Sequence, residues 1–206
     1  MLSVRMFFSK KGPVRYISHL DISRAISRAL VRSGLDIVFT EGYNPHVRLV
    51  FVQPLSIFQE SIYEVADFRL HTEDISFEEI TEALNKVMPD GITVLFTASP
   101  VMAVGDCAYA TYTIALDTDM SDDEIRDELS GEMVINKKTK SGYKDVDISE
   151  FVKKVSVKDK VVDITVCAAC NRCLNPALAV QYLGDKVRSS LITRTGLYNE
   201  KMEKFI

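Results

Sequence analysis

Residues 17–53 read ISHLDISRAISRALVRSGLDIVFTEGYNPHVRLVFVQ, and the pattern of this stretch decides the fold of the N-terminal half. Ser18 and Asp21 have the spacing of a capping box, in which each side chain satisfies a free backbone group of the first helical turn. Because glycine adopts the left-handed conformation that ends many helices, Gly34 sets the end of a helix over 18–33. Apolar residues at helical spacing predict its buried face. These residues are Ile22, Ile26, Ala29 and Leu30.

After this helix, the segment 41–46 reads EGYNPH and combines turn-forming residues with polar side chains. Functional residues concentrate on loops that rigid elements hold in place, and arginines recur every four residues on the helix face away from the apolar one. The alternative interpretation is structural, with a helix cap and a solvated basic face. The candidate ligand-binding residues are Ser18, His19, Asp21, Arg24, Arg28, Glu41, Gly42, Tyr43, Asn44, Pro45, His46 and Arg48.

Charge is distributed unevenly along the chain. Residues 1–50 contain eight lysines and arginines against three acidic residues, a local charge of +5, whereas the 206-residue chain has a net charge of −4. A basic pole on an acidic body favours an anionic partner, such as RNA, a phosphate group or an acidic protein surface. A chance asymmetry on a solvated surface is the alternative.

Strand and helix patterns in the first half follow the order βαββαβ, which is that of ferredoxin-like units. The expected strands cover 4–9, 47–52, 63–70 and 92–96, and the second helix begins with a capping box at Ser76 and Glu79. The second half repeats this order less clearly, with a polar excursion over 137–147. We therefore predict an α+β fold of tandem ferredoxin-like units, with antiparallel sheets and helices on one face. The first unit covers 1–100 and carries the SHLD and EGYNPH motifs, and the second, more divergent unit covers 107–206.

Three motifs carry a resemblance to a known family. GPVRYISHLD at 12–21, EGYNPHVRLVFVQPL at 41–55 and ITRTGLY at 192–198 resemble the radical SAM-linked protein family. This bacterial family is associated with radical SAM enzymes that have a cobalamin-binding domain, and some members are encoded near ribonuclease E/G-type enzymes. The resemblance covers nearly the whole chain. It implies a radical SAM enzyme as partner and RNA as a candidate ligand.

The resemblance also implies which residues matter. We add Arg15 and Arg194 to the candidate ligand-binding residues on this basis. The family has a glycine shortly after Pro-Leu, where this chain has Ile57 and Phe58, so the shape of that turn does not follow from the resemblance. The family pattern falls on Gly12, Arg15, Ser18, His19, Leu20, Asp21, Arg24, Glu41, Gly42, Asn44, Pro45, His46, Pro54, Leu55, Glu60, Glu64, Arg194 and Thr195.

The four cysteines raise the question of a metal. Cys167, Cys170 and Cys173 have CxxCxxC spacing, and Cys107 is a distant fourth. Thiolates at such spacing ligate zinc or iron–sulfur clusters, but the sequence has neither the paired CxxC motifs of a zinc ribbon nor the CxxxCxxC of a radical SAM core. We favour the interpretation that these cysteines act as small buried hydrophobic residues, and we predict no metal and no cofactor. The alternative is a metal site formed by all four cysteines.

The favoured function is an accessory or substrate-binding protein that binds an anionic ligand at the basic N-terminal pole and works with a radical SAM enzyme. One alternative is a hydrolase or nuclease in which His19, Asp21, Glu41 and His46 form an acid–base cluster, since histidine titrates near neutrality and a carboxylate can orient it. The other is a pure protein-interaction adaptor. In the favoured case the chain has no catalytic residues.

No apolar run approaches the roughly 20 residues that span a membrane. The N-terminal residues also lack the basic, apolar and small-residue segments of a signal peptide. We therefore expect a cytoplasmic protein that does not bind a membrane.

Overall fold

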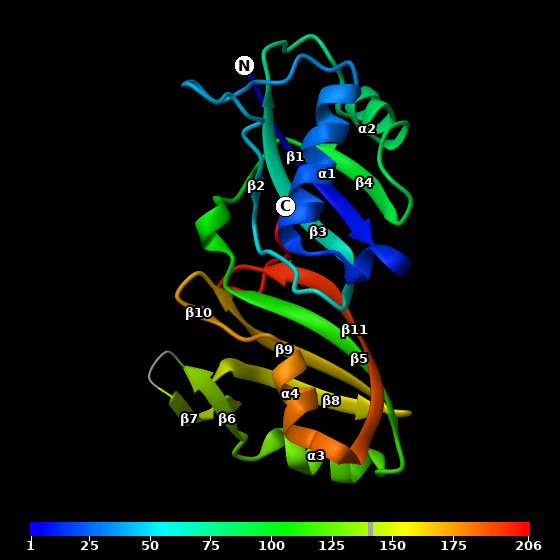
Figure 1. Ribbon diagram of the computed structural model, residues 1–206, viewed down its shortest axis with the longest axis vertical. Helices are drawn as coiled ribbons and strands as arrows, with labels where there is room; N and C mark the ends of the chain where they lie inside the picture. The colour runs from blue at the N-terminus through cyan, green and yellow to red at the C-terminus, as the bar shows by residue number, and fades with distance from the viewer. Residues whose placement is uncertain (140–141) are drawn as a thin grey trace. The chain divides into compact units, whose positions relative to one another are not determined.

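The computed structural model describes residues 1–139 and 142–206, which divide into two compact units (Figure 1). Unit 1 is Met1–Cys107 together with Lys204–Ile206, and unit 2 is Ala108–Glu203. The described residues form a mixed α+β fold of mostly antiparallel sheet with four α-helices. Among them, no helix combines the length and the apolar character that crossing a bilayer requires.

Unit 1 packs two helices against one face of an antiparallel sheet. The strand order is β4-β1-β3-β2, and each neighbouring pair is antiparallel. Alternate residues of β1, namely Val4, Met6 and Phe8, join buried residues of both helices in one core. The elements are β1 (Leu2–Lys10), the 3-10 helix η1 (Gly12–Tyr16), α1 (His19–Arg32), β2 (Val50–Phe51), β3 (Gln59–Leu70), α2 (Phe77–Asn85), β4 (Ile92–Ala98) and the 3-10 helix η2 (Val104–Asp106).

The first predicted helix is confirmed as α1. Ser18 is its N-cap, and the Ser18 Oγ accepts a hydrogen bond of 3.2 Å from the Asp21 N–H. Gly34 follows the helix with a φ of 78°, the left-handed conformation that glycine adopts without a steric penalty. The buried residues of α1 are the predicted ones, Ile22, Ile26, Ala29 and Leu30. The capping box of Ser76 and Glu79 at the start of α2 is confirmed as well.

The strand expected over 47–52 is wrong in its length. Only Val50–Phe51 forms β2, which pairs with Asp67 and Ala66 of β3. The Leu49 N–H bonds locally to the Val47 carbonyl at 3.0 Å, and Val47 pairs with Phe39 in an isolated bridge. These local bonds hold the backbone before Val50 out of the ladder with β3, although its apolar pattern is that of a strand.

The last three residues of the chain belong to unit 1, which the sequence pattern did not indicate. Phe205 is fully buried, and its carbonyl accepts a hydrogen bond of 2.9 Å from the Tyr63 hydroxyl. The Arg5 guanidinium donates to the Ile206 carbonyl at 2.9 Å and lies over the Phe205 ring. The end of the chain therefore packs against the β1 and β3 residues of this unit.

Unit 2 also combines helices with an antiparallel sheet. Strand β5 lies between β9 and β11, and both β8 and β10 pair with β9. Its elements are β5 (Tyr109–Thr118), α3 (Asp122–Ser130), β6 (Val134–Thr139), β7 (Gly142–Asp147), the 3-10 helix η3 (Ser149–Phe151), β8 (Val152–Lys158), β9 (Val161–Ala169), β10 (Arg172–Cys173), α4 (Ala177–Leu183), the 3-10 helix η4 (Gly184–Lys186) and β11 (Val187–Tyr198).

The polar excursion expected over 137–147 contains regular structure. Residues 142–147 form β7, which pairs with β6 in an antiparallel hairpin, while residues 140–141 of this prediction lie outside the described residues. Polar side chains hid this hairpin, because β7 is largely exposed and has no buried face to produce an apolar alternation.

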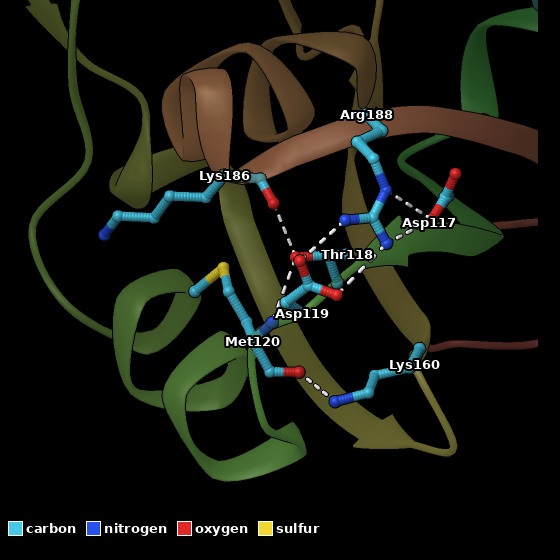
Figure 2. A network of polar contacts seen from close by, with 7 residues as sticks. All are labelled: Asp117, Thr118, Asp119, Met120, Lys160, Lys186 and Arg188. Atoms are coloured by element: carbon cyan, nitrogen blue, oxygen red, sulfur yellow. Dashed lines mark hydrogen bonds and ion pairs between the residues drawn. The ribbon is translucent and has the colours of Figure 1, made fainter.

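A polar network joins the end of β5 to the start of β11 (Figure 2). The Arg188 guanidinium bonds Asp117 at 2.9 Å and Asp119 at 2.7 Å, and this hydrogen bonding holds the pKa of Asp119 below its usual value. The Thr118 hydroxyl donates to the Lys186 carbonyl, and the Lys160 ammonium donates to the Met120 carbonyl. The network ties the loop before α3 to its neighbours from residues far along the chain.

Candidate functional site

The start of α1 forms the first part of the candidate site. His19 is the first helical residue, and its ring meets the Phe51 ring of β2 edge to face, with centroids 4.7 Å apart. Partial burial lowers the pKa of His19, and the charge of Lys10 lowers it further. The imidazole is therefore neutral at pH 7, because its ordinary pKa already lies below 7.

Ser18 and Asp21 interact with each other and with the helix backbone. The Ser18 hydroxyl donates to the Asp21 Oδ2 at 2.7 Å, and Arg24 approaches the Asp21 Oδ1 at 3.4 Å. Both carboxylate oxygens of Asp21 thus have a partner. Ser18 is confirmed as the N-cap, but the described hydrogen bonds contain only this half of the predicted capping box, because the Asp21 carboxylate accepts from the Ser18 hydroxyl. A role of the pair in ligand binding stays a prediction.

Arg15 lies in η1 beside a carboxylate of β3. Its guanidinium is 3.6 Å from the Glu60 Oε1, which also accepts a hydrogen bond of 2.9 Å from the Gly12 N–H. The Phe58 N–H donates to the Arg15 carbonyl at 2.7 Å, and Phe58 adopts a φ of 69°. Glycine would suit this left-handed conformation, so here a phenylalanine occupies a position that favours glycine.

The 41–46 segment forms the predicted turn and is exposed throughout. The Thr40 N–H donates to the His46 carbonyl at 2.8 Å, and the His46 N–H donates to the Thr40 Oγ1 at 3.1 Å. The His46 Nδ1 lies 3.2 Å from the Asn44 carbonyl. Tyr43 is fully exposed. The turn therefore presents its side chains to solvent on a hydrogen-bonded frame.

The structure does not bring the four acid–base candidates together. The turn with Glu41 and His46 follows the end of α1, whereas His19 and Asp21 lie at its start (Figure 1). Within the described part of the chain, no hydrogen bond or ion pair joins one pair to the other. Two separate groups of candidates result, one in the first turn of α1 and one in the 41–46 turn.

The basic residues of α1 differ in their partners. Arg24 faces Asp21, and Arg32 donates to the Val87 carbonyl at 3.0 Å. Arg28 is exposed, and it has no ion pair among the residues that the structure describes. The predicted basic face of α1 is thus exposed to solvent, and a carboxylate neutralises only part of its charge.

A hollow of about 360 Å³ in unit 1 gathers further arginines. Arg48, a predicted residue, lines it together with Arg69, and both are exposed. Sequence reasoning missed Arg69. The signal was the alternation in β3, where Asp67 and Arg69 flank the core residue Phe68 and so leave the sheet on the face opposite the core.

Comparison with protein families now adds to this geometry. The model of a bacterial family, described as "Uncharacterized protein conserved in bacteria (DUF2344)", matches residues 3–176. The chain belongs to this family. The DUF2344 match includes α1, the 41–46 turn and the residues of the hollow. No curated protein matches the chain.

Arg194 lies beyond the stretch that the DUF2344 model matches. It belongs to β11 of unit 2 and is only 1% exposed. Its guanidinium donates to the hydroxyl of Tyr112 on β5, at 2.9 and 3.1 Å. Burial and these bonds give Arg194 a place in the packing of β11 on β5, while a contact with a ligand stays a prediction.

The four cysteines of this DUF2344 member form no disulfide bond in the described structure. Cys107 and Cys167 are buried, and Cys170 and Cys173 are exposed at the β9–β10 hairpin. The described residues contain no group of three or more histidine, cysteine and acidic side chains that could hold a metal ion. The alternative metal site of the four cysteines therefore has no support in the geometry.

Proposed function

We propose that this protein binds an anionic ligand through unit 1 and does not itself catalyse a reaction. The observation that carries this proposal is the difference among the basic residues of the unit. Arg5, Arg15 and Arg24 face Asp67, Glu60 and Asp21. The exposed Arg28, Arg48 and Arg69 have no such carboxylate among the described residues. Exposed cations without a carboxylate partner provide positive potential for an anion.

The arrangement of the acid–base candidates also favours binding over catalysis. A general acid and base must lie within hydrogen-bonding reach of one reacting group. His19 lies at the start of α1 and is packed against Phe51, whereas His46 lies in the exposed 41–46 turn. A hydrolase with both histidines at one centre has no support in this arrangement, and we keep it as the rival that activity assays would reveal.

The proposed partner comes from the resemblance alone. We infer a radical SAM enzyme with a cobalamin-binding domain, to which this protein would present its ligand. Co-elution of the two purified proteins in size-exclusion chromatography is the expected result. Co-elution without any RNA binding would favour the adaptor alternative.

We also infer that each unit is a ferredoxin-like fold. Element order in unit 1 and the antiparallel sheet order β4-β1-β3-β2 support this. In unit 2, the same order results for β11-β5-β9-β8 when the β6–β7 hairpin and β10 are treated as insertions.

RNA is the anionic ligand to test first. We expect total cellular RNA to bind more tightly at about 50 mM than at about 200 mM salt, because binding to phosphates releases counterions. An Arg24→Ala, Arg28→Ala double variant should bind more weakly and depend less on salt, since each lost phosphate contact flattens the salt dependence. Fluorescence anisotropy with labelled RNA measures both quantities.

The matched control removes two exposed cations from unit 2. Lys154 and Lys158 of β8 are exposed, so the Lys154→Ala, Lys158→Ala variant has the same change in net charge. Equal weakening in both double variants would indicate a general charge effect and contradict a binding pole in unit 1. Absence of binding at the lower salt would exclude RNA and leave the enzyme partner as the next test.

A further inference from the structure

Three arginines line the hollow of unit 1: Arg5 of β1, Arg69 of β3 and Arg48, which precedes β2. Val50 of β2 pairs with Asp67 of β3, and Asp67 pairs with Arg5 of β1. Arg48 precedes β2, while Arg69 of β3 pairs with Ser3 of β1, and both arginines line the hollow. Three arginines, Arg5, Arg48 and Arg69, thus line one space.

The charges around this space do not balance. Asp67 provides the only carboxylate among the described residues that line it. Both oxygens of this carboxylate are taken by Arg5, whose Nε and terminal nitrogen each lie 2.7 Å from one of them. Arg48 and Arg69 therefore leave an excess of two positive charges around the hollow.

We propose that this hollow binds a phosphate monoester, held between Arg48 and Arg69. A phosphate monoester has a charge of about −1.5 to −2 at pH 7, which matches the excess. Guanidinium groups also bind phosphate oxygens in bidentate geometry. This inference rests on the proposed function and names the chemistry and the place of the anionic ligand.

The lining beside the arginines indicates an organic ligand rather than inorganic phosphate. Val50, Met102 and Val104 contribute apolar surface to the hollow. Its volume of about 360 Å³ lies in the range of small-molecule sites, which begins near 300 Å³. The phosphate would thus bind the arginines while an attached base or sugar covers the apolar wall. A free nucleotide and the 5′ end of an RNA both provide this chemistry.

The test uses the full chain and three probes, measured by isothermal titration calorimetry and anisotropy. The probes are adenosine monophosphate, a 5′-phosphorylated RNA oligonucleotide and the same oligonucleotide with a 5′ hydroxyl. We expect an Arg48→Ala, Arg69→Ala variant to bind the phosphorylated probes about tenfold more weakly or worse, because each arginine loses charge-assisted hydrogen bonds. The Lys154→Ala, Lys158→Ala variant should bind them like the parent protein.

A second variant separates charge from geometry. Arg48→Lys, Arg69→Lys keeps both charges but loses the planar fork. We expect this lysine variant to bind the phosphorylated probes more weakly than the parent protein and more tightly than the alanine variant. Folding of each variant is checked by circular dichroism, and neither arginine has an ion pair in the described structure whose loss would destabilise the unit.

The outcomes identify the source of the phosphate. Preference for the 5′-phosphorylated RNA over its 5′-hydroxyl form supports an RNA end, and binding of adenosine monophosphate without that preference supports a free nucleotide. Equal binding of both oligonucleotides, with no binding of the monophosphate, would overturn the site. In that case the proposed function still holds if the Arg24→Ala, Arg28→Ala variant weakens RNA binding. If no anion binds the parent protein, both the site and the proposed function are wrong.

Discussion

At the scale of single residues, Phe58 adopts a backbone conformation that its type of side chain disfavours. Phe58 has a φ of 69°, and its side chain is 64% exposed. A hydrogen bond from its N–H to Arg15 and an edge contact with the Tyr16 ring hold it there. Residues 57 and 58 were predicted to form a turn of uncertain shape, and the backbone strain at Phe58 was not visible in the sequence.

Replacing Phe58 separates this strain from the loss of its ring. We expect Phe58→Gly to be more stable than Phe58→Ala by about 1 kcal/mol, because both lose the ring and only glycine adopts the left-handed conformation without a steric penalty. Urea unfolding of both variants measures the difference. Equal stabilities would show that the position relaxes out of this conformation in the alanine variant.

At the scale of secondary structure elements, local signals determined the helices. Each helix signal depends on residues only three or four positions apart, so it can be found in the sequence. These signals are the caps at Ser18 and Ser76 and the apolar face of α1. The strands were less certain, because a strand exists only where a partner completes its hydrogen bonds. Thus β2 is shorter than its apolar pattern indicated, and β7 forms although its sequence has no apolar alternation.

The turn after α2 supports the element that holds Arg15. Gly91 has a φ of 86°, and its carbonyl accepts a hydrogen bond of 2.8 Å from the Lys11 N–H next to η1. A Cβ at this position would meet the Lys11 carbonyl oxygen at 2.7 Å and a methyl group of Val14 at 2.8 Å. Close backbone approach therefore requires glycine here.

Alanine at Gly91 should destabilise unit 1 strongly. We expect a loss of about 2 to 4 kcal/mol in the free energy of unfolding, from backbone strain together with overpacking. Gly34→Ala is the matched control, because Gly34 has a similar φ of 78° but open space at its Cβ, and it should lose only about 1 kcal/mol. Chemical denaturation of both variants measures this, and similar losses would contradict the steric argument.

At the scale of the whole molecule, the two units differ in their acid-sensitive groups. In unit 2, hydrogen bonds or ion pairs hold the pKa of several described carboxylates below their usual values: Asp119, Asp122, Glu124, Glu128 and Asp147. In unit 1, hydrogen bonds lower the pKa of Glu73 and Glu79. Each such group stabilises the folded state when ionised.

Acid should therefore weaken unit 2 before unit 1. Because folding lowers the pKa of these carboxylates, their stabilisation is present above the unfolded pKa of about 4 and is lost as the pH falls through the folded pKa. Their exposure limits the size of the effect through solvent screening. Hydrogen exchange of β5 and β1 amides between about pH 5 and pH 3 measures it, and earlier opening of β1 would contradict the prediction.

The sequence by itself determined the helix over 18–33, its buried face, the 41–46 turn and the excess of positive charge in the first 50 residues. Each depends on residues close together in the chain or on composition alone. Only the tertiary structure decided that Arg5 and Arg15 are paired, because their carboxylate partners are remote in the sequence, whereas Arg24 faces the nearby Asp21. Asp67 is 62 residues from Arg5, and strand register brings it there. The tertiary structure also places Arg48 and Arg69 in the lining of one hollow, and no local pattern encodes this placement.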